Sequence, residues 1–208
     1  MLIDPERDEV TVDGREITPP ARHIYVALNK PKGVIVSAAD PGRRTTVFDL
    51  VSSAEAGSPR LFAVGRLDFE SSGLILLTDD GDAAHRLMHP RHKVPKEYLA
   101  VVNGLPTERD LKALREGVEL EDGLTQPAEV TLLGNALRVS ELRIVIKEGR
   151  NRQVRRMLEA VGHPCRDLQR LAFGPIRLGR LREGGWRKLR EAEVESLLSA
   201  AGMKSAGH

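Results

Sequence analysis

The order of hydrophobic and polar positions predicts short strands through the first two thirds of the chain. Short apolar runs alternate with turn-forming Gly, Pro and Asp-Gly positions. These runs are EVTV, HIYVAL, VIVS, LFAVG, GLILLT, EYLAVV, AEVTLL and LRVSELRIVI. Helical periodicity occurs in the segments 81–88, 107–116, 150–161 and 191–201. Because strands and helices do not alternate regularly, the pattern predicts an α+β fold with a mixed, largely antiparallel sheet rather than a doubly wound one.

The helix predicted at 150–161 has one apolar stripe. Its apolar positions recur at i, i+3, i+4 and i+7: Val154, Met157, Leu158 and Val161. At 3.6 residues per turn, Arg152 and Arg156 fall roughly opposite this stripe, whereas Arg155 is about 100° from its first residue. The pattern therefore predicts that Arg152 and Arg156 are available to phosphates and that Arg155 reaches inward.

The composition is that of an ordinary folded protein. With 208 residues and 40% hydrophobic content, the chain can bury a core. It has no apolar run near the ~18 residues that a membrane span requires, and its first residues are acidic. A single cysteine, Cys165, excludes an intramolecular disulfide and a multi-cysteine zinc site, which favours a reducing compartment. We therefore expect a cytoplasmic protein.

Charge is unevenly distributed along the chain, although the net charge is only +2. From Arg138 to Arg190 there are 15 Lys and Arg against 5 Asp and Glu, a local charge of +10. Such a segment is typical of a protein that binds a polyanion, because each phosphate contact releases counterions. A solvated face of arginines, balanced by acidic neighbours in the fold, gives the same count. Charge alone leaves both interpretations open.

The segment from Leu61 to Gly81 places a carboxylate in a polar turn between two apolar runs. Asp68 would be held there on rigid flanks while it faces a cleft, which suits a catalytic group. The same aspartate and the serines after it are also ordinary turn formers, so the pattern alone does not decide. Asp79 and Asp80 fit the cap of the helix that follows.

Six sequence blocks follow one another between about residues 24 and 196. They are ALNKPKGVIVS, GRLD with SSGLILLTDDG, LMHP, KEY, EGRNRQVRRMLEAVGHP and LAFGPIRLGRLREGGWRKL. In content and order they resemble the signature blocks of bacterial rRNA pseudouridine synthases of the RsuA type, a far more specific match than one short motif. The resemblance implies the pseudouridine synthase type of sheet, with two lobes around a basic cleft, and isomerisation of uridine to pseudouridine in ribosomal RNA.

The resemblance also implies three catalytic residues. The catalytic carboxylate of the family's GRLD block corresponds to Asp68, and the tyrosine of its K-x-Y block, which packs on the target uracil, corresponds to Tyr98. The arginine that pairs with the aspartate corresponds to Arg155, with Arg152 and Arg156 as close neighbours. The reaction is a redox-neutral isomerisation, so no cofactor or metal is expected. Asp68 either attacks the sugar or assists loss of a proton from it.

Basic residues of the same blocks are expected to hold the RNA. The target must be flipped out of its stack into a pocket, and seven aromatic residues are too few for a stacking platform. Phosphate contacts should therefore dominate. Arg66 is expected to fill the space that the flipped base leaves or to hold a phosphate, the alternative being an ordinary surface arginine. The expected RNA-binding residues are Lys30, Lys32, Arg66, Lys96, Arg150, Arg152 and Arg156.

The resemblance further predicts the substrate and the domain boundaries. LMHP with KEYLAVVNG is closer to the large-subunit branch, so 23S rRNA is favoured over 16S rRNA, and the protein is expected to act as a monomer. Relatives generally begin with a small alpha-L RNA-binding module, of which DPERDEVTVDGREI resembles only the last strands. We therefore expect a remnant of that module and a linker at 1–22, the catalytic domain at 23–202 and a flexible tail at 203–208.

Other classes of function match part of the pattern. A non-catalytic RNA-binding or ribosome-assembly protein would have the same basic segment but would be indifferent to loss of Asp68. A glycosidase would use two carboxylates, and Asp68 and Glu70 are spaced to share a strand face. A zinc site at His85, His89 and His92 lacks a convincing third ligand, because the proline after His89 ends the helix.

Overall fold

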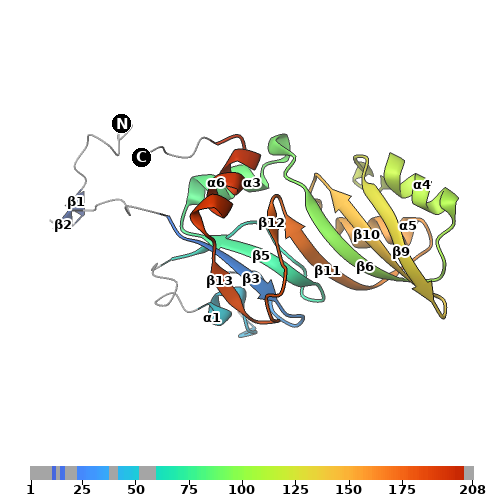
Figure 1. Ribbon diagram of the computed structural model, residues 1–208, viewed down its shortest axis with the longest axis horizontal. Coiled ribbons are helices and arrows are strands. Elements are labelled where there is room, and N and C mark those ends of the chain that lie inside the picture. Colours follow the sequence, from blue (N-terminus) through green and yellow to red (C-terminus); the bar gives the residue numbers. More distant parts are fainter. Residues whose placement is uncertain (1–10, 13–14, 17–22, 38–41, 52–59, 204–208) are drawn as a thin grey trace.

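A computed structural model describes residues 11–12, 15–16, 23–37, 42–51 and 60–203. Its body is a nine-stranded mixed sheet in which seven strands follow the order β13-β3-β5-β11-β6-β10-β9 (Figure 1). β4 pairs with β5, and β12 pairs with β11. Every pairing in this sheet is antiparallel except that of β5 with β11, which is parallel. The predicted α+β class and its largely antiparallel sheet are confirmed.

The large sheet is built from strands throughout the chain. They are β3 (Tyr25–Lys30), β4 (Phe62–Ala63), β5 (Ser72–Thr78), β6 (Lys96–Asn103), β9 (Glu129–Ala136), β10 (Val139–Ile146), β11 (Cys165–Phe173), β12 (Ile176–Arg177) and β13 (Trp186–Lys188). Two small hairpins are separate from it: β1 (Thr11–Val12) with β2 (Arg15–Glu16), and β7 (Glu119–Leu120) with β8 (Gly123–Leu124). The helices are α1 (Val47–Leu50), α3 (Gly81–Met88), the 3₁₀ turn η1 (Pro90–His92), α4 (Glu108–Glu116), α5 (Gln153–Ala160) and α6 (Glu191–Ala200).

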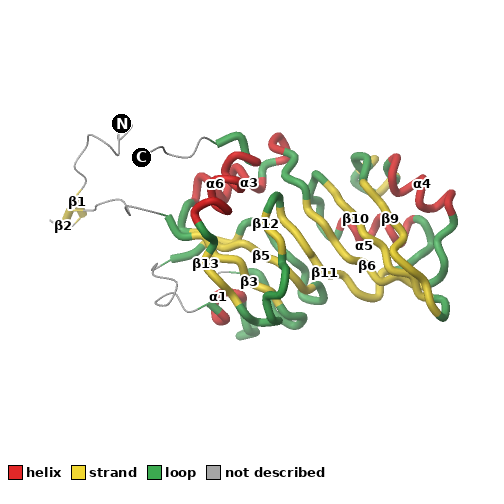
Figure 2. Tube along the Cα trace, viewed as in Figure 1, coloured by secondary structure: helices red, strands yellow, loops and turns green. Residues whose placement is uncertain are grey.

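Two hydrophobic clusters cover the two faces of the sheet. In Figure 2, α3 and α6 lie together near one end of the sheet, and α4 and α5 lie near the other. Val26 and Ile75 belong to the cluster that includes α4 and α5, whereas Ala27 and Leu74 belong to the one that includes α3 and α6. β3 and β5 are therefore buried on both faces, which explains why their sequences are continuous apolar runs rather than alternating ones.

Three of the four predicted helices form within a residue of the expected bounds. Asp80 caps α3 by accepting a hydrogen bond from the backbone N–H of Ala83 at 2.8 Å, as its position indicated. Thr107 and Asp110 form a capping box at the start of α4. α5 begins later than predicted, because Arg152 has a left-handed backbone with φ of 46° and occupies the N-cap position. The helical spacing used for Arg152 therefore does not apply to it.

The strand predictions miss the short strands β7, β8, β12 and β13, and they are wrong in two longer segments. The run VIVS at 34–37 forms only an isolated bridge between Ile35 and Thr46. β11 was not predicted, although it lies at the centre of the sheet between β5 and β6. Polar residues interrupt its sequence, CRDLQRLAF, and two register shifts against β6 break its alternation. The expectation that strands are concentrated in the first two thirds is corrected accordingly.

A close backbone approach explains why β11 fits beside β5. Gly73 has a φ of 103°, and a Cβ added there would lie 2.3 Å from the carbonyl oxygen of Arg170. Only glycine allows the two strands to approach this closely.

The ends of the chain are described only in small part. Most of the predicted module remnant at 1–22 and of the tail at 203–208 lies outside the described residues. Within the described ranges, no helix is long and apolar enough to span a membrane.

Candidate active site

A pocket of about 370 Å³ opens between three parts of the fold. The loop that leads into β5 contributes one wall, β6 and β11 form the floor, and the loop at 149–152 before α5 contributes the opposite wall. One acidic side chain, Asp68, belongs to the described lining. The cationic residues of this lining are Arg66, Lys96, Arg150, Arg152 and Arg170. A single carboxylate therefore lies in a basic pocket.

Asp68 is held in a turn between β4 and β5. Its backbone carbonyl accepts a hydrogen bond from the N–H of Ser71 at 3.0 Å, which closes the turn. Its side chain is 30% exposed, and its Oδ2 lies 3.9 Å from Nη1 of Arg152. The left-handed backbone of Arg152, an uncommon conformation for a residue other than glycine, points this guanidinium toward the loop that carries the aspartate.

Arg155 has other partners than the one predicted. Its guanidinium donates hydrogen bonds to the carbonyl of Glu70 at 3.2 Å and to Oγ of Ser71 at 3.3 Å. A third bond, of 3.3 Å, reaches the carbonyl of Cys165 on β11. Since α5 begins at Gln153, Arg155 lies in its first turn and is buried against the end of the Asp68 turn. In this structure Arg152 pairs with Asp68, and Arg155 holds the turn that carries it. The catalytic role of Arg155 stays a prediction.

Tyr98 reaches the pocket from β6. Its side chain is 7% exposed and belongs to the lining. It stands opposite Ile144 on one neighbouring strand and Arg170 on the other. The sheet thus holds an aromatic ring in the same pocket as the carboxylate, and Asp68 and Tyr98 come together as the sequence predicted.

A family model described as RNA pseudouridylate synthase matches residues 24–160, which is most of the described sheet. The chain belongs to the RNA pseudouridylate synthase family. Ribosomal large subunit pseudouridine synthase E of Xanthomonas axonopodis pv. citri is 47% identical over 177 residues, covering 76% of this chain and 90% of that protein. Ribosomal large subunit pseudouridine synthase B of Bacillus subtilis is 39% identical over 196 residues, covering 93% and 79%.

A solved structure described as a pseudouridylate synthase has the same fold. It superposes with a TM-score of 0.77 at 34% identity, and the match covers 95% of this chain and 83% of that one. The family membership predicted from the sequence blocks is therefore confirmed, and with it the activity class, an isomerase that acts on RNA uridines.

Within this pseudouridine synthase fold, Lys30 is not available to RNA. Its side chain is fully buried, and Nζ donates to the carbonyls of Pro31 at 2.8 Å and Val34 at 2.7 Å. Burial lowers the pKa of Lys30 to about 8, against the opposing effect of Asp68. The predicted RNA contact stays a prediction, and in this structure the side chain faces inward because β3 is buried on both faces, including its last residue. Lys30 instead supports the loop after β3 from inside.

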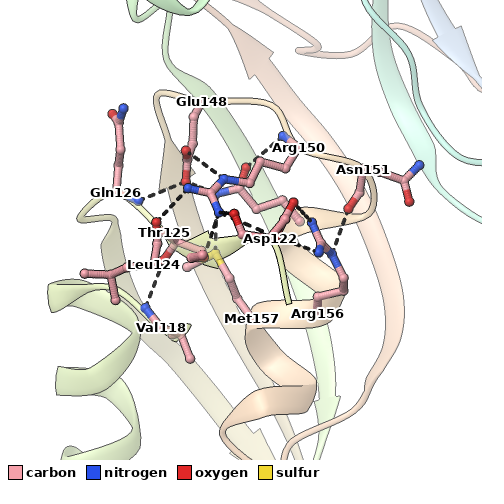
Figure 3. Close-up of polar contacts among 12 residues, drawn as sticks. Val118, Asp122, Leu124, Thr125, Gln126, Glu148, Arg150, Asn151, Arg156 and Met157 are labelled. Carbon is pink, nitrogen blue, oxygen red and sulfur yellow. Dashed lines mark hydrogen bonds and ion pairs between the residues drawn. The ribbon is translucent and has the colours of Figure 1, made fainter. Parts of the chain in front are cut away.

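Arg150 and Arg156 are also occupied by the protein itself (Figure 3). Arg156 makes two hydrogen bonds to the carboxylate of Asp122, at 2.9 and 3.0 Å. Arg150 donates to the carbonyls of Gly123 at 2.7 Å and Leu124 at 2.6 Å. Together they fasten the β7–β8 hairpin to the start of α5. Their predicted RNA contacts stay predictions, and helical spacing could not show that a hairpin covers the polar face of the helix.

Glu148 completes this network from the other side. Its Oε1 accepts hydrogen bonds from the backbone N–H of Gln126 and from the side chain of Gln153, and its Oε2 accepts one from Arg150. These bonds fix both ends of the loop at 149–152 that forms one wall of the pocket. The network therefore holds this wall of the pocket in place.

The remaining predicted RNA-binding residues differ in position. Arg66 is exposed and borders the pocket. Lys96 lines it, with Nζ 3.1 Å from the carbonyl of Val94 and 5.4 Å from the centre of the Phe173 ring. Burial, and then the charge of Arg170, lower the pKa of Lys96 to about 8. Lys32 forms a half-exposed ion pair of 2.9 Å with Asp167.

Arg170 is the pocket residue that the sequence analysis missed. It is 2% exposed, and its Nε donates to the carbonyl of Leu74 at 2.6 Å. Its buried Nη2 has no hydrogen-bond partner among the described residues. The signal that could have found it is the arginine within LQRLAF, an apolar run that was not predicted to be a strand.

The structure does not favour the rival enzyme class. Glu70 is exposed and does not belong to the described lining of the pocket, so it does not form a carboxylate pair with Asp68 there. His85, His89 and His92 contact one another through their rings, at centroid distances of 5.8 and 6.1 Å. In the described ranges, no group of three His, Cys, Asp or Glu could hold a metal ion.

Proposed function

We propose that this protein converts a specific uridine of large-subunit ribosomal RNA to pseudouridine in the pocket around Asp68. The observation that carries the proposal is the single carboxylate of the described lining, surrounded by cationic side chains and paired with Arg152. The two large-subunit pseudouridine synthases named above support 23S rRNA as the substrate. The protein would act as a monomer in the cytoplasm, where ribosomes are assembled.

The chemistry assigns one task to each of the central residues. The bond between uracil N1 and ribose C1′ breaks, uracil turns, C5 bonds to C1′, and the proton of C5 is replaced by one on N1. No electrons are gained or lost, so the reaction requires neither an oxidant nor a reductant. The Asp68 carboxylate acts on the sugar, by attack on C1′ or by removal of the neighbouring proton. Arg152 orients this carboxylate, and the ring of Tyr98 packs on the turned uracil.

The basic lining supports the RNA part of the proposal. A flipped nucleotide carries its phosphates into the pocket, where Arg66, Lys96 and Arg170 have no acidic neighbour in the lining except Asp68. Arg155 acts indirectly, by holding the Asp68 turn against β11. The predicted catalytic set of Asp68, Tyr98 and Arg155 thus becomes Asp68 and Tyr98, with Arg152 and Arg155 as positioning residues.

The experiment that tests the proposal compares the wild-type protein with Asp68→Asn. Tritium release from C5-labelled uridine is measured in unmodified 23S and 16S rRNA. We expect release from 23S rRNA with the wild type and a loss of more than about 100-fold with the variant. A thermal melt and an RNA-binding measurement check that the variant is folded and still binds.

Each rival predicts a different result. Equal release by Asp68→Asn and wild type would contradict the assignment of the carboxylate. Tritium release from 16S rRNA alone would show that the substrate is the small-subunit RNA instead of 23S rRNA. Binding to rRNA without release by either protein would favour a non-catalytic role in ribosome assembly.

A further inference from the structure

A second hollow adjoins the active-site pocket on the side of β4 and α3. Its volume is about 490 Å³, and it shares Gly65, Arg66 and Met88 with the pocket around Asp68. Its described lining is mainly apolar and includes no acidic residue. The two hollows therefore meet at Arg66, whose exposed side chain borders both.

Two exposed large hydrophobic side chains line this second hollow. Phe62 is 39% exposed and Met88 is 44% exposed, although both are large hydrophobic side chains. The guanidinium of Arg60 lies over the Phe62 ring at 5.3 Å from its centre. An exposed aromatic ring with a guanidinium stacked on it offers the flat, polarisable surface on which unpaired nucleobases stack.

The neighbouring pocket determines what can occupy the hollow. When a uridine enters the Asp68 pocket, the nucleotides on either side are covalently tied to it and must lie at the rim. Arg66 lies where the linking phosphate would pass, and a cation there binds that phosphate. The absence of acidic residues from the described lining disfavours a basic peptide as the occupant.

We propose that this second hollow binds the base of a nucleotide adjacent to the target uridine, unstacked from the RNA and packed on Phe62, with its phosphate held by Arg66. The proposal rests on the proposed function, because it requires a uridine of RNA in the first pocket. A single stacking contact of this kind adds affinity and sequence context without replacing the phosphate contacts. It also helps to offset the unstacking that flipping requires.

The experiment is a double-mutant cycle between protein and RNA. The substrate is a short RNA hairpin that contains the mapped uridine, made with an intact or an abasic nucleotide directly 5′ or 3′ of it. The proteins are wild type, Phe62→Ala, Phe62→Tyr and, as a matched control, Leu133→Ala. Leu133 is an exposed leucine on β9 that lines neither hollow.

We expect Phe62→Ala to raise KM about tenfold, with kcat within about twofold, and Phe62→Tyr and Leu133→Ala to resemble wild type. At one of the two flanking positions, the abasic nucleotide should raise KM for wild type and have no further effect in Phe62→Ala. An unchanged KM in Phe62→Ala, or independent effects at both positions, would overturn the inference.

The abasic substrates also test the wild-type protein alone, so the result does not depend on whether Phe62→Ala folds. Equal KM values for intact and abasic RNAs at both positions would by themselves overturn the inference. Absence of pseudouridine from the intact RNA with wild-type protein would overturn the proposed function as well. Conversion of the intact RNA with no flanking-base effect would overturn only the second site.

Discussion

Two groups of charged residues meet at the start of α5 and differ in how their charge is balanced. On one side, Arg150 and Arg156 form several short hydrogen bonds with the β7–β8 hairpin, including the carboxylate of Asp122. On the other side, Arg152 reaches the partly exposed carboxylate of Asp68 across 3.9 Å. Arginines that are close neighbours in sequence therefore have opposite roles: two stabilise the fold, and one remains available at the pocket.

The pKa shifts show a similar contrast. At the hairpin the protein favours the charged forms of its side chains, whereas in the pocket it disfavours the charged form of a lysine. The hydrogen bonds from Arg156 lower the pKa of Asp122 and in turn raise that of Arg156, so both stay charged. In the pocket, burial lowers the pKa of Lys96 to about 8. Positive charge there is not fully compensated by the protein, and an anionic ligand would complete it. This comparison indicates that a high density of arginines does not by itself identify an RNA-binding surface.

The largest expected effect separates Arg152 from Arg156. Arg152→Ala should lower kcat about 10- to 100-fold, because Asp68 loses the cation that orients it. Arg156→Ala should keep kcat within about twofold, because its partner lies in the hairpin. Single-turnover tritium release at saturating RNA measures both. Equal losses of kcat in the two variants would contradict the division of these arginines into one that acts at the pocket and one that stabilises the fold.

The sequence predicted the fold class and the helices well because their signals are local. Caps such as Asp80 and Thr107 and regular apolar spacing are properties of short segments. β11 was missed because its position depends on partners far away in sequence. Its place between β5 and β6, with Gly73 permitting close approach, cannot be read from its own polar and irregular residues.

For the site, the sequence correctly brought Asp68 and Tyr98 to one pocket, but it did not predict the partners that several basic residues have within the protein. Arg152 adopts a left-handed backbone that a helical wheel does not represent. Lys30 ends a strand that is buried on both faces, and Arg156 lies under a hairpin that spacing within α5 cannot reveal. Each of these features is set by tertiary packing, which local sequence patterns do not show.

A smaller effect concerns Lys30 and the pH dependence of stability. Its pKa is about 8 in the folded protein and near the ordinary 10.5 when unfolded. Between these values the unfolded chain binds more protons, so this lysine makes the free energy of unfolding rise with pH. Lys30→Met removes that contribution. The free energy of unfolding of the wild type minus that of Lys30→Met should therefore increase from pH 8 to pH 10.5.

Urea denaturation of both proteins across this range measures the difference. Tyr25, whose pKa is raised by burial and by its bond to Asp80, makes wild-type stability fall at high pH, but it does so in both proteins and cancels. Parallel curves for wild type and Lys30→Met would show that Lys30 is not held away from water.

The smallest effect concerns salt. Because Arg156 is bound to Asp122, Arg156→Ala should lower the melting temperature by a few degrees but leave the salt dependence of RNA affinity unchanged. Arg66→Ala, which removes an exposed arginine at the pocket rim, should instead reduce the slope of log K against log salt by about one and leave the melting temperature unchanged. Filter binding of 23S rRNA fragments at several salt concentrations gives the slopes. If Arg156→Ala lowered the slope as Arg66→Ala does, the Arg156–Asp122 pair would open in the complex and Arg156 would contact phosphate after all.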